Sequence, residues 1–319
     1  MDWTDRHCRY LHRLLSTQTL LYTEMVTAPA LVRGGALHLL DFSPQEHPVA
    51  LQLGGSDPAE LAEAARLGAE AGYDEINLNV GCPSDRVQSG AFGAILMTQP
   101  ALVAQCVTAM RAAVPIDVTV KCRIGVDDQD PETVLPDFLA RVVGAGCERV
   151  TIHARKAWLK GLSPKENRDI PPLDYDLVMR MKALFPHLHI SVNGGITTIA
   201  EAKAFLDGGL DGVMIGRAAY HDPCSVLCGA DHDIFETDHS ITPEAAVIAM
   251  LPYVEAHLAQ GGRLNQITRH MMGMFTGRPG ARAWRRLLSE KATQKGAGPD
   301  LLLEALACVT PLEAPATSV

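Results

Sequence analysis

EINLNVG, residues 75–81, is typical of a short strand, because apolar and polar residues alternate and the run ends at a glycine. Similar runs occur along the chain at residues 20–27, 48–55, 117–125, 149–155, 189–195 and 211–217. Alanine-rich segments such as PAELAEAARLGAEAG and ALVAQCVTAMRAAV lie between them and are typical of helices. Strands that alternate with helices predict a parallel sheet.

A polar residue recurs near the carboxyl end of five of these predicted strands. Side chains alternate between the two faces of a strand, so apolar neighbours such as Leu51 and Val120 pack under the helices. The polar residues are Gln52, Asn79, Lys121, His153 and Asn193, separated by 27, 42, 32 and 40 positions. This recurrence predicts the top face of a (β/α)8 barrel. A doubly wound sheet is the alternative, which the even recurrence and the lack of a GxGxxG turn disfavour.

The strand–helix pattern stops after Asp222. We therefore expect a catalytic barrel domain over residues 1–228 and a linker over the acidic, irregular residues 229–241. Only helical patterns follow, which predicts a separate helical domain over residues 242–319.

The charge of the chain is acidic overall but unevenly distributed. The net charge of −9 over 319 residues argues weakly against a nucleic-acid partner. Residues 153–168 nevertheless contain five cations against one acidic residue, and residues 263–291 contain seven against one. Two such segments can bind a polyanion locally. Two solvated surfaces are the alternative interpretation.

The cysteines and the N-terminal residues limit the other classes of site and partner. Eight cysteines are scattered without a CxxC pair or a histidine cluster, so no metal site is expected. MDWTDRHCRY has no apolar signal segment, and no apolar run approaches the roughly 18 residues that a membrane span needs. A cytoplasmic protein without a membrane partner is expected.

SVNGGI and, about twenty residues later, GVMIGRAAY form the first specific signal for a ligand. Gly194 and Gly195 leave backbone N–H groups uncovered, and Gly216 precedes Arg217. The loops after the last two strands of such barrels frequently bind phosphate. A phosphate there, with Lys121 above the barrel near the N1/O2 edge of a flavin ring, suits flavin mononucleotide (FMN).

Several motifs spread over nearly the whole chain resemble the tRNA-dihydrouridine synthases. They are MDWTDRHCR, LQLGGSDP, INLNVGCPSDRVQSGAFGA, VTVKCRIG, IHARKAWLKGLSPKENRDIPPLDY, NGGI and GRAAY. KAWLKGLSPKENR and ITRHMMGMFTGRPGARAWRR are similar to the A-type subfamily, which acts at positions 20 and 20a of the tRNA D-loop.

The resemblance implies a reaction and a set of site residues. NADPH reduces FMN, the flavin passes a hydride to C6 of a flipped uracil, and a cysteine, here Cys82, donates a proton to C5. Thiols are mostly protonated at neutral pH and can act as acids, and Gly90 and Gly93 would let the cysteine loop close. The implied FMN contacts are Met1, Gln52, Lys121, His153, Asn193, Gly194, Gly195, Gly216 and Arg217. The implied tRNA contacts are Asn79, Lys165, Arg168, Arg282 and Arg285.

One departure from the family pattern and two other functions stay open. The family opens with a strand ending in Ala-Pro-Met before DWTD, whereas this sequence begins at the methionine and lacks that first barrel strand. Either the start is assigned too far downstream, which we favour because an open barrel exposes a buried edge, or the barrel is open and FMN binding is impaired. Another FMN barrel, of the dihydroorotate or ene-reductase type, would not account for the basic helical segment. An RNA-binding module without catalysis is the second alternative. No protein partner is evident, and a monomer is expected.

Overall fold

The computed structural model describes residues 3–84 and 92–309. The chain divides into two compact units. One comprises Met1–Arg6 and Leu20–Gly216, and the other comprises His7–Thr19 and Arg217–Val319. The second unit thus begins before residue 229, and it also takes in an N-terminal segment that sequence patterns alone did not assign to it.

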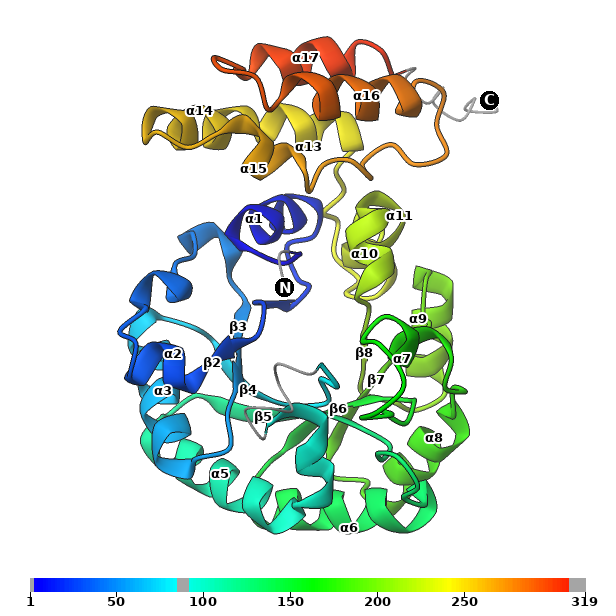
Figure 1. Cartoon of the computed structure of the whole chain (residues 1–319). Helices are drawn as coiled ribbons and strands as arrows, with labels where there is room; N and C mark the ends of the chain where they lie inside the picture. The colour runs from blue at the N-terminus through cyan, green and yellow to red at the C-terminus, as the bar shows by residue number, and fades with distance from the viewer. Residues whose placement is uncertain (1–2, 85–91, 310–319) are drawn as a thin grey trace. The chain divides into compact units, whose positions relative to one another are not determined.

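The first unit is built on a parallel sheet (Figure 1). Its strands run in the order β1-β3-β4-β5-β6-β7-β8, and β2 also pairs with β3. They are β1 (Leu21–Tyr22), β2 (Val26–Thr27), β3 (Val49–Gly54), β4 (Glu75–Val80), β5 (Asp117–Arg123), β6 (Arg149–His153), β7 (His189–Asn193) and β8 (Gly212–Met214). Among the described residues, β1 and β8 stand at the two ends of this order. The fold is therefore a (β/α)8-like half-barrel, as the strand–helix alternation predicts.

Helices cover the outer face of this sheet (Figure 1). They are α3 (Pro58–Ala71), α5 (Pro100–Ala113), α6 (Pro131–Gly144), α8 (Tyr175–Leu184) and α9 (Ile199–Asp207). Asp57 shows how they begin, since its side chain accepts a hydrogen bond from the N–H of Glu60 and caps α3. A Cβ atom on Gly68 would lie 2.5 Å from Leu51 Cδ2, so α3 packs closely on β3. Within the described part of the chain, no helix is long and apolar enough to cross a membrane.

The core lies between the sheet and these helices. Leu51, Leu78, Val120 and Ile152 are fully buried, and they occupy the strand faces that alternation assigned to the helix side. Shorter helices complete the unit: α2 (Ala28–Val32), η1 (Leu37–Leu40), η2 (Pro44–Glu46), η3 (Gly93–Thr98) and α7 (Glu166–Asp169).

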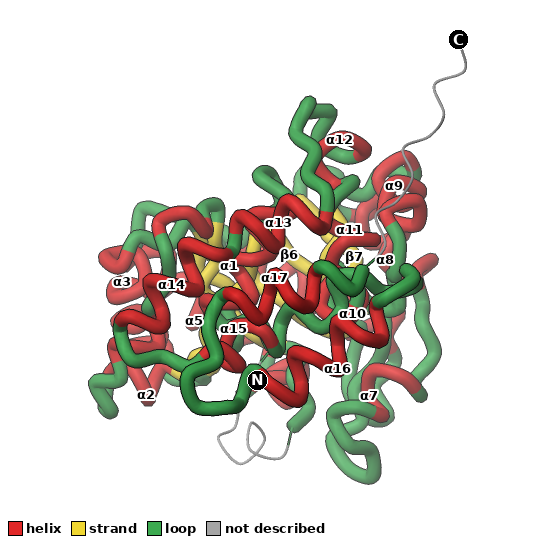
Figure 2. The backbone as a smooth tube through the Cα atoms, turned by 90° about the horizontal axis from the view of Figure 1, so that it is seen from above, coloured by secondary structure: helices red, strands yellow, loops and turns green. Residues whose placement is uncertain are grey.

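The second unit consists of helices and loops, which Figure 2 shows in red and green. They are α1 (Arg6–Leu15), α10 (Arg217–His221), α11 (Pro223–Leu227), α12 (Ala230–Asp233), α13 (Pro243–Ala249), α14 (Leu251–Ala259), α15 (Leu264–Thr268), α16 (Ala281–Lys291) and α17 (Asp300–Leu306). Trp284 of α16 is fully buried, and its indole N–H donates to the carbonyl oxygen of Met271 at 2.9 Å. Its ring also meets Phe275 edge to face, with 4.9 Å between ring centroids.

Residues 229–241, expected to be a linker, are partly folded into the second unit. α12 lies in this segment, and Asp231 is buried there. Its carboxylate accepts hydrogen bonds from the side chain of Ser16, the side chain and N–H of Thr17, and the N–H of Gln18. These bonds hold the segment on the loop after α1, which local composition could not indicate because the partners lie more than 200 positions away.

Candidate active site

The polar residues at the strand ends come together at the carboxyl edge of the sheet. Register places Asn79 beside Lys121, and His153 beside both Arg123 and Asn193. Asn79 and His153 are buried, whereas Gln52, Lys121 and Asn193 are half-buried. Gln52 and Asn79 also contact each other directly, since the amide nitrogen of Asn79 donates to Gln52 Oε1 at 2.8 Å.

Cys82 lies just after β4, on a turn that Asn79 holds. Asn79 Oδ1 accepts hydrogen bonds from the N–H groups of Gly81 and Cys82 at 3.0 and 2.9 Å. The thiol is half-buried and lies 3.5 Å from Ser84 Oγ. Ala94 N–H donates to the carbonyl oxygen of Cys82 at 2.9 Å and fixes the returning chain. Gly93 precedes it with φ +74°, a conformation that favours glycine. Gly90 lies outside the described residues.

Arg123, at the end of β5, binds three carbonyl groups from two segments of the chain. Its Nε donates to the oxygen of Gly81 at 3.1 Å, and one terminal nitrogen donates to those of Lys156 and Asn167 at 3.1 and 2.9 Å. Burial lowers the pKa of this guanidinium to about 10, so it stays charged at neutral pH. Arg123 therefore ties the Cys82 turn to the segment that bears Lys165 and Arg168. The sequence analysis did not select Arg123, although its position two residues after Lys121 puts it on the same face of the strand.

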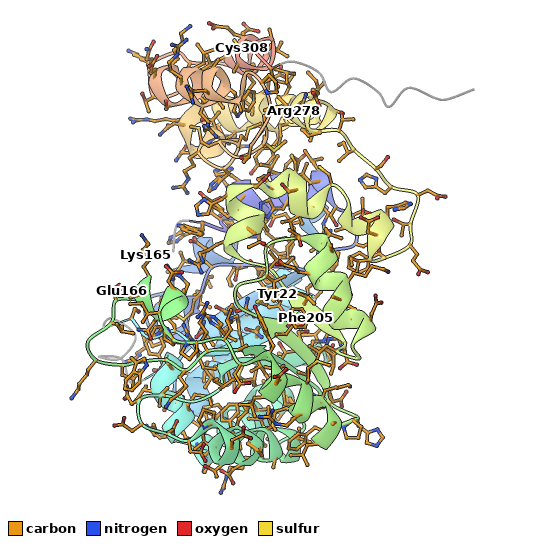
Figure 3. All side chains as sticks on the ribbon, turned by 90° about the vertical axis from the view of Figure 1, so that its right-hand side faces the viewer. Tyr22, Lys165, Glu166, Phe205, Arg278 and Cys308 are labelled. Carbon is orange, nitrogen blue, oxygen red and sulfur yellow. The ribbon has the colours of Figure 1, made fainter. Side chains whose placement is uncertain are left out.

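Asn167 organises this second segment. Its side chain is fully buried, accepts from the N–H of Trp158 at 2.7 Å, and donates to the carbonyl oxygens of Trp158 and Leu162 at 2.9 and 3.1 Å. The two predicted tRNA contacts near Asn167 are more exposed to solvent. Lys165 is exposed and Arg168 is half-buried, and Figure 3 shows Lys165 pointing away from the ribbon at α7. Sequence reasoning named the two cations and missed the asparagine between them.

Lys121 places a cation at the carboxyl edge of the sheet. Among the described residues, no hydrogen-bond acceptor or acidic partner contacts its ammonium group. Burial, and then the nearby Arg123 charge, lower the pKa of Lys121 to about 8. A half-buried lysine without a partner is poised to receive an electron-rich ligand atom. The neighbouring Cys122 thiol is buried on the opposite face, where burial raises its pKa to about 12.

The glycines after β7 allow close approach of backbone and side chains. Gly194 has φ +112°, and a Cβ atom there would lie 2.6 Å from Cδ2 and 2.9 Å from Nε2 of His153. Gly195 has φ +74°, and the Tyr175 hydroxyl donates to the carbonyl oxygen of Gly194. Asn193 turns its amide nitrogen to the carbonyl oxygen of Met214 at 2.8 Å, which links β7 to β8.

The remaining predicted ligand contacts are placed as follows. Gly216 is exposed, and nothing described lies within 4 Å of a Cβ atom built on it. Arg217 is half-buried and begins α10 in the second unit. Met1 lies outside the described residues.

α16 carries a basic stripe in the helical unit. Arg282, Arg285 and Arg286 are exposed, whereas Trp284 and Leu288 are buried. The two faces follow from helical spacing, since residues three and four apart lie side by side. This helix therefore has one cationic and one apolar face.

A solved structure supports the fold. The chain resembles morphinone reductase with a TM-score of 0.51 and 12% sequence identity, over 76% of this chain and 83% of that one. At this identity the likeness concerns the architecture alone.

Relatives with much higher identity identify the family. The tRNA-dihydrouridine(20/20a) synthase of Vibrio cholerae serotype O1 is 58% identical over 309 residues, which cover 96% of this chain and 94% of that protein. The protein of the same name from Escherichia coli strain K12 is 60% identical over 311 residues, covering 97% and 89%. The profile of the dihydrouridine synthase (Dus) family matches residues 1–310. The chain therefore belongs to the dihydrouridine synthase family of oxidoreductases.

Proposed function

We propose that this protein reduces the C5–C6 bond of uridine to 5,6-dihydrouridine at positions 20 and 20a of the tRNA D-loop, with FMN as cofactor and NADPH as electron donor. The family and the names of the relatives support the reaction and the positions. The other flavin barrels considered for this sequence lose support, because relatives of this identity over nearly the whole chain act on tRNA.

The residues at the carboxyl edge fit a flavin mononucleotide. Among the described residues the ammonium of Lys121 has no hydrogen-bond acceptor, so it can meet the electron-rich edge of the ring. His153 lies close against Gly194. The glycines leave backbone N–H groups accessible to a phosphate. When bound, FMN accepts electrons from NADPH and supplies the hydride that adds to C6. Its contacts would be Met1, Gln52, Lys121, His153, Asn193, Gly194, Gly195, Gly216 and Arg217.

Cys82 would supply the proton that completes the reduction. A hydride at C6 leaves an electron pair at C5, and the S–H bond of Cys82 breaks to form the new C–H bond there. Because the thiol is half-buried, solvent can return the proton to the thiolate after each turnover. Asn79 and Arg123 hold the turn that carries this thiol through hydrogen bonds to Cys82 and Gly81. These bonds fix the position of the Cys82 side chain.

Substrate binding would use the exposed cations. Lys165, Arg168, Arg282 and Arg285 can contact phosphates of a structured RNA, which is held mainly through its backbone and shape. Asn79 lies next to Cys82 and would contact the target uridine.

The observation that carries the proposal is that the half-buried thiol of Cys82 and Lys121, which has no hydrogen-bond acceptor among the described residues, lie at the same edge of the sheet. Register brings Asn79, which holds the Cys82 turn, directly beside Lys121. Cys82 can then donate the proton, while Lys121 can bind the edge of the flavin that supplies the hydride. Reduction of the C5–C6 bond requires both the proton and the hydride.

The experiment is to map dihydrouridine in tRNA from cells that lack this gene. We expect loss of dihydrouridine at positions 20 and 20a, restored by the wild-type gene but not by Cys82→Ala. Cys308→Ala is the matched control, because this exposed cysteine lies in the helical unit and should restore the modification. Unchanged dihydrouridine in the deletion strain would refute the proposed function.

A further inference from the structure

A continuous line of hydrogen-bonded side chains crosses one face of β3, β4 and β5, from the Cys82 turn to the opposite end of β4. The proposed reaction uses only the residues at the end nearest Cys82. From Asn79 the line passes to Gln52 Oε1 at 2.8 Å. Gln52 Nε2 donates to Asn77 Oδ1 at 2.9 Å, and Asn77 Nδ2 donates to Thr119 Oγ1 at 2.8 Å. Thr119 donates in turn to a carboxylate oxygen of Glu75 at 2.6 Å.

Glu75 closes the line at the opposite end of β4. It is 3% exposed, and the Tyr22 hydroxyl and the Arg149 guanidinium donate to it at 2.7 and 2.9 Å. Figure 3 labels Tyr22 within the first unit. Glu75, Asn77 and Asn79 are spaced by two, so they share one face of the strand. Neighbouring strands contribute the other members of the line, Gln52 from β3 and Thr119 from β5.

The line has one direction only. The N–H groups of Gly81 and Cys82 can only donate, so they require the oxygen of Asn79. With that oxygen engaged, the amide nitrogen of Asn79 faces Gln52 and donates to its Oε1. Gln52 Nε2 then donates to Asn77 Oδ1, which leaves Asn77 Nδ2 to donate to Thr119. At the lower end Tyr22 and Arg149 also donate to the carboxyl oxygens of Glu75, so Glu75 acts as the acceptor, and Thr119 donates to it while accepting from Asn77. Both ends therefore select the same orientation of all three amides.

We propose that Thr119 and Glu75 are positioning residues, which fix the amide orientations of Asn77, Gln52 and Asn79 and thereby hold the Cys82 turn in place from inside the sheet. Hydrogen bonds in such chains strengthen one another, and an unpaired buried amide is costly. Loss of a central link therefore propagates to the turn. The inference rests on the proposed function only in the use it assigns to Cys82.

Thr119→Val tests this inference, because valine keeps the shape of threonine and removes the hydroxyl. The primary measurement is the rate at which iodoacetamide alkylates Cys82 in the purified flavin-containing protein, followed by peptide mass spectrometry. We expect about fivefold faster alkylation, the effect of weakening one hydrogen bond of ordinary strength. The exposed Cys308 in the same digest is the internal reference and should not change. Thr119→Ser keeps the hydroxyl and should restore the wild-type rate.

The second measurement separates positioning from general damage. Dihydrouridine formation by Thr119→Val should show a kcat lowered about fivefold, and Thr119→Ser should restore it. If Thr119→Val does not fold, Thr119→Ala takes its place, since alanine also removes the hydroxyl that links Asn77 to Glu75. Equal Cys82 alkylation in the folded variant and the wild type would overturn the inference. Faster alkylation of Thr119→Val, together with no dihydrouridine formation by the wild-type protein, would support the inference and reject the proposed function.

Discussion

Arg123→Met should damage the protein more than the loss of any exposed arginine. Arg123 is 3% exposed, and its guanidinium donates to the carbonyl oxygens of Gly81, Lys156 and Asn167. Methionine fills a similar volume but donates no hydrogen bond, so three carbonyl groups lose a charged partner. Taking about 1 kcal/mol for each, below the usual range because burying the charge itself costs free energy, gives about 3 kcal/mol.

Urea denaturation followed by circular dichroism measures this difference. The denaturation midpoint should fall with an unchanged slope. Arg141→Met is the matched control, because Arg141 pairs with Asp137 on the exposed face of α6. Its removal should change the free energy of unfolding by less than about 0.5 kcal/mol.

Arg123→Met should also lower two functional quantities together. Arg123 contacts the Cys82 turn and the segment of Lys165 and Arg168, so both kcat for dihydrouridine formation and tRNA affinity should decrease. Equal midpoints for Arg123→Met and Arg141→Met, with full activity in both, would refute the role of Arg123 as the link between the two segments.

Three further predictions concern the flavin and the RNA. The affinity of the flavin-free protein for FMN should weaken as the pH rises through about 8, where Lys121 loses its proton. Fluorescence titration with FMN measures this affinity, and Lys121→Met should remove its pH dependence. Gly194→Ala should reduce bound flavin, measured by absorbance at about 450 nm, because its Cβ atom would lie 2.6 Å from the His153 ring and its φ of +112° disfavours alanine; undiminished flavin content would contradict this. Arg285→Glu should weaken tRNA binding and flatten its salt dependence at unchanged flavin content, whereas the neighbouring Ser289→Ala should bind tRNA like the wild type.

The strands were predictable from the sequence because their limits are local. Residues 75–81 were expected to form a strand and Glu75–Val80 do, since alternation and the following glycine are both visible in the chain. The strand-end polar residues were predictable for the same reason. Parallel strands bring their carboxyl ends to one edge, so order alone implied that Asn79 and Lys121 would meet.

The links between segments were not predictable in this way. Thr119 and Glu75 are 44 positions apart, and their hydrogen bond depends on the register of β4 with β5. Asp231 was expected in a linker and is buried, because its partners Ser16 and Thr17 come from the N-terminal helix region. Such contacts require the folded chain, whereas the alternation of Glu75, Asn77 and Asn79 could have marked the inner face of β4.

A single-turnover experiment tests the assignment of Cys82 most directly. Wild-type protein and Cys82→Ala, each reduced by one equivalent of NADPH without oxygen, are mixed with tRNA from the deletion strain. Mass spectrometry then counts dihydrouridine at positions 20 and 20a while absorbance follows the flavin. Wild-type protein should form one dihydrouridine for each flavin reoxidised, whereas Cys82→Ala should stay reduced and leave the uridines intact. Equal dihydrouridine from both proteins at the same rate would contradict the assignment of the proton to Cys82.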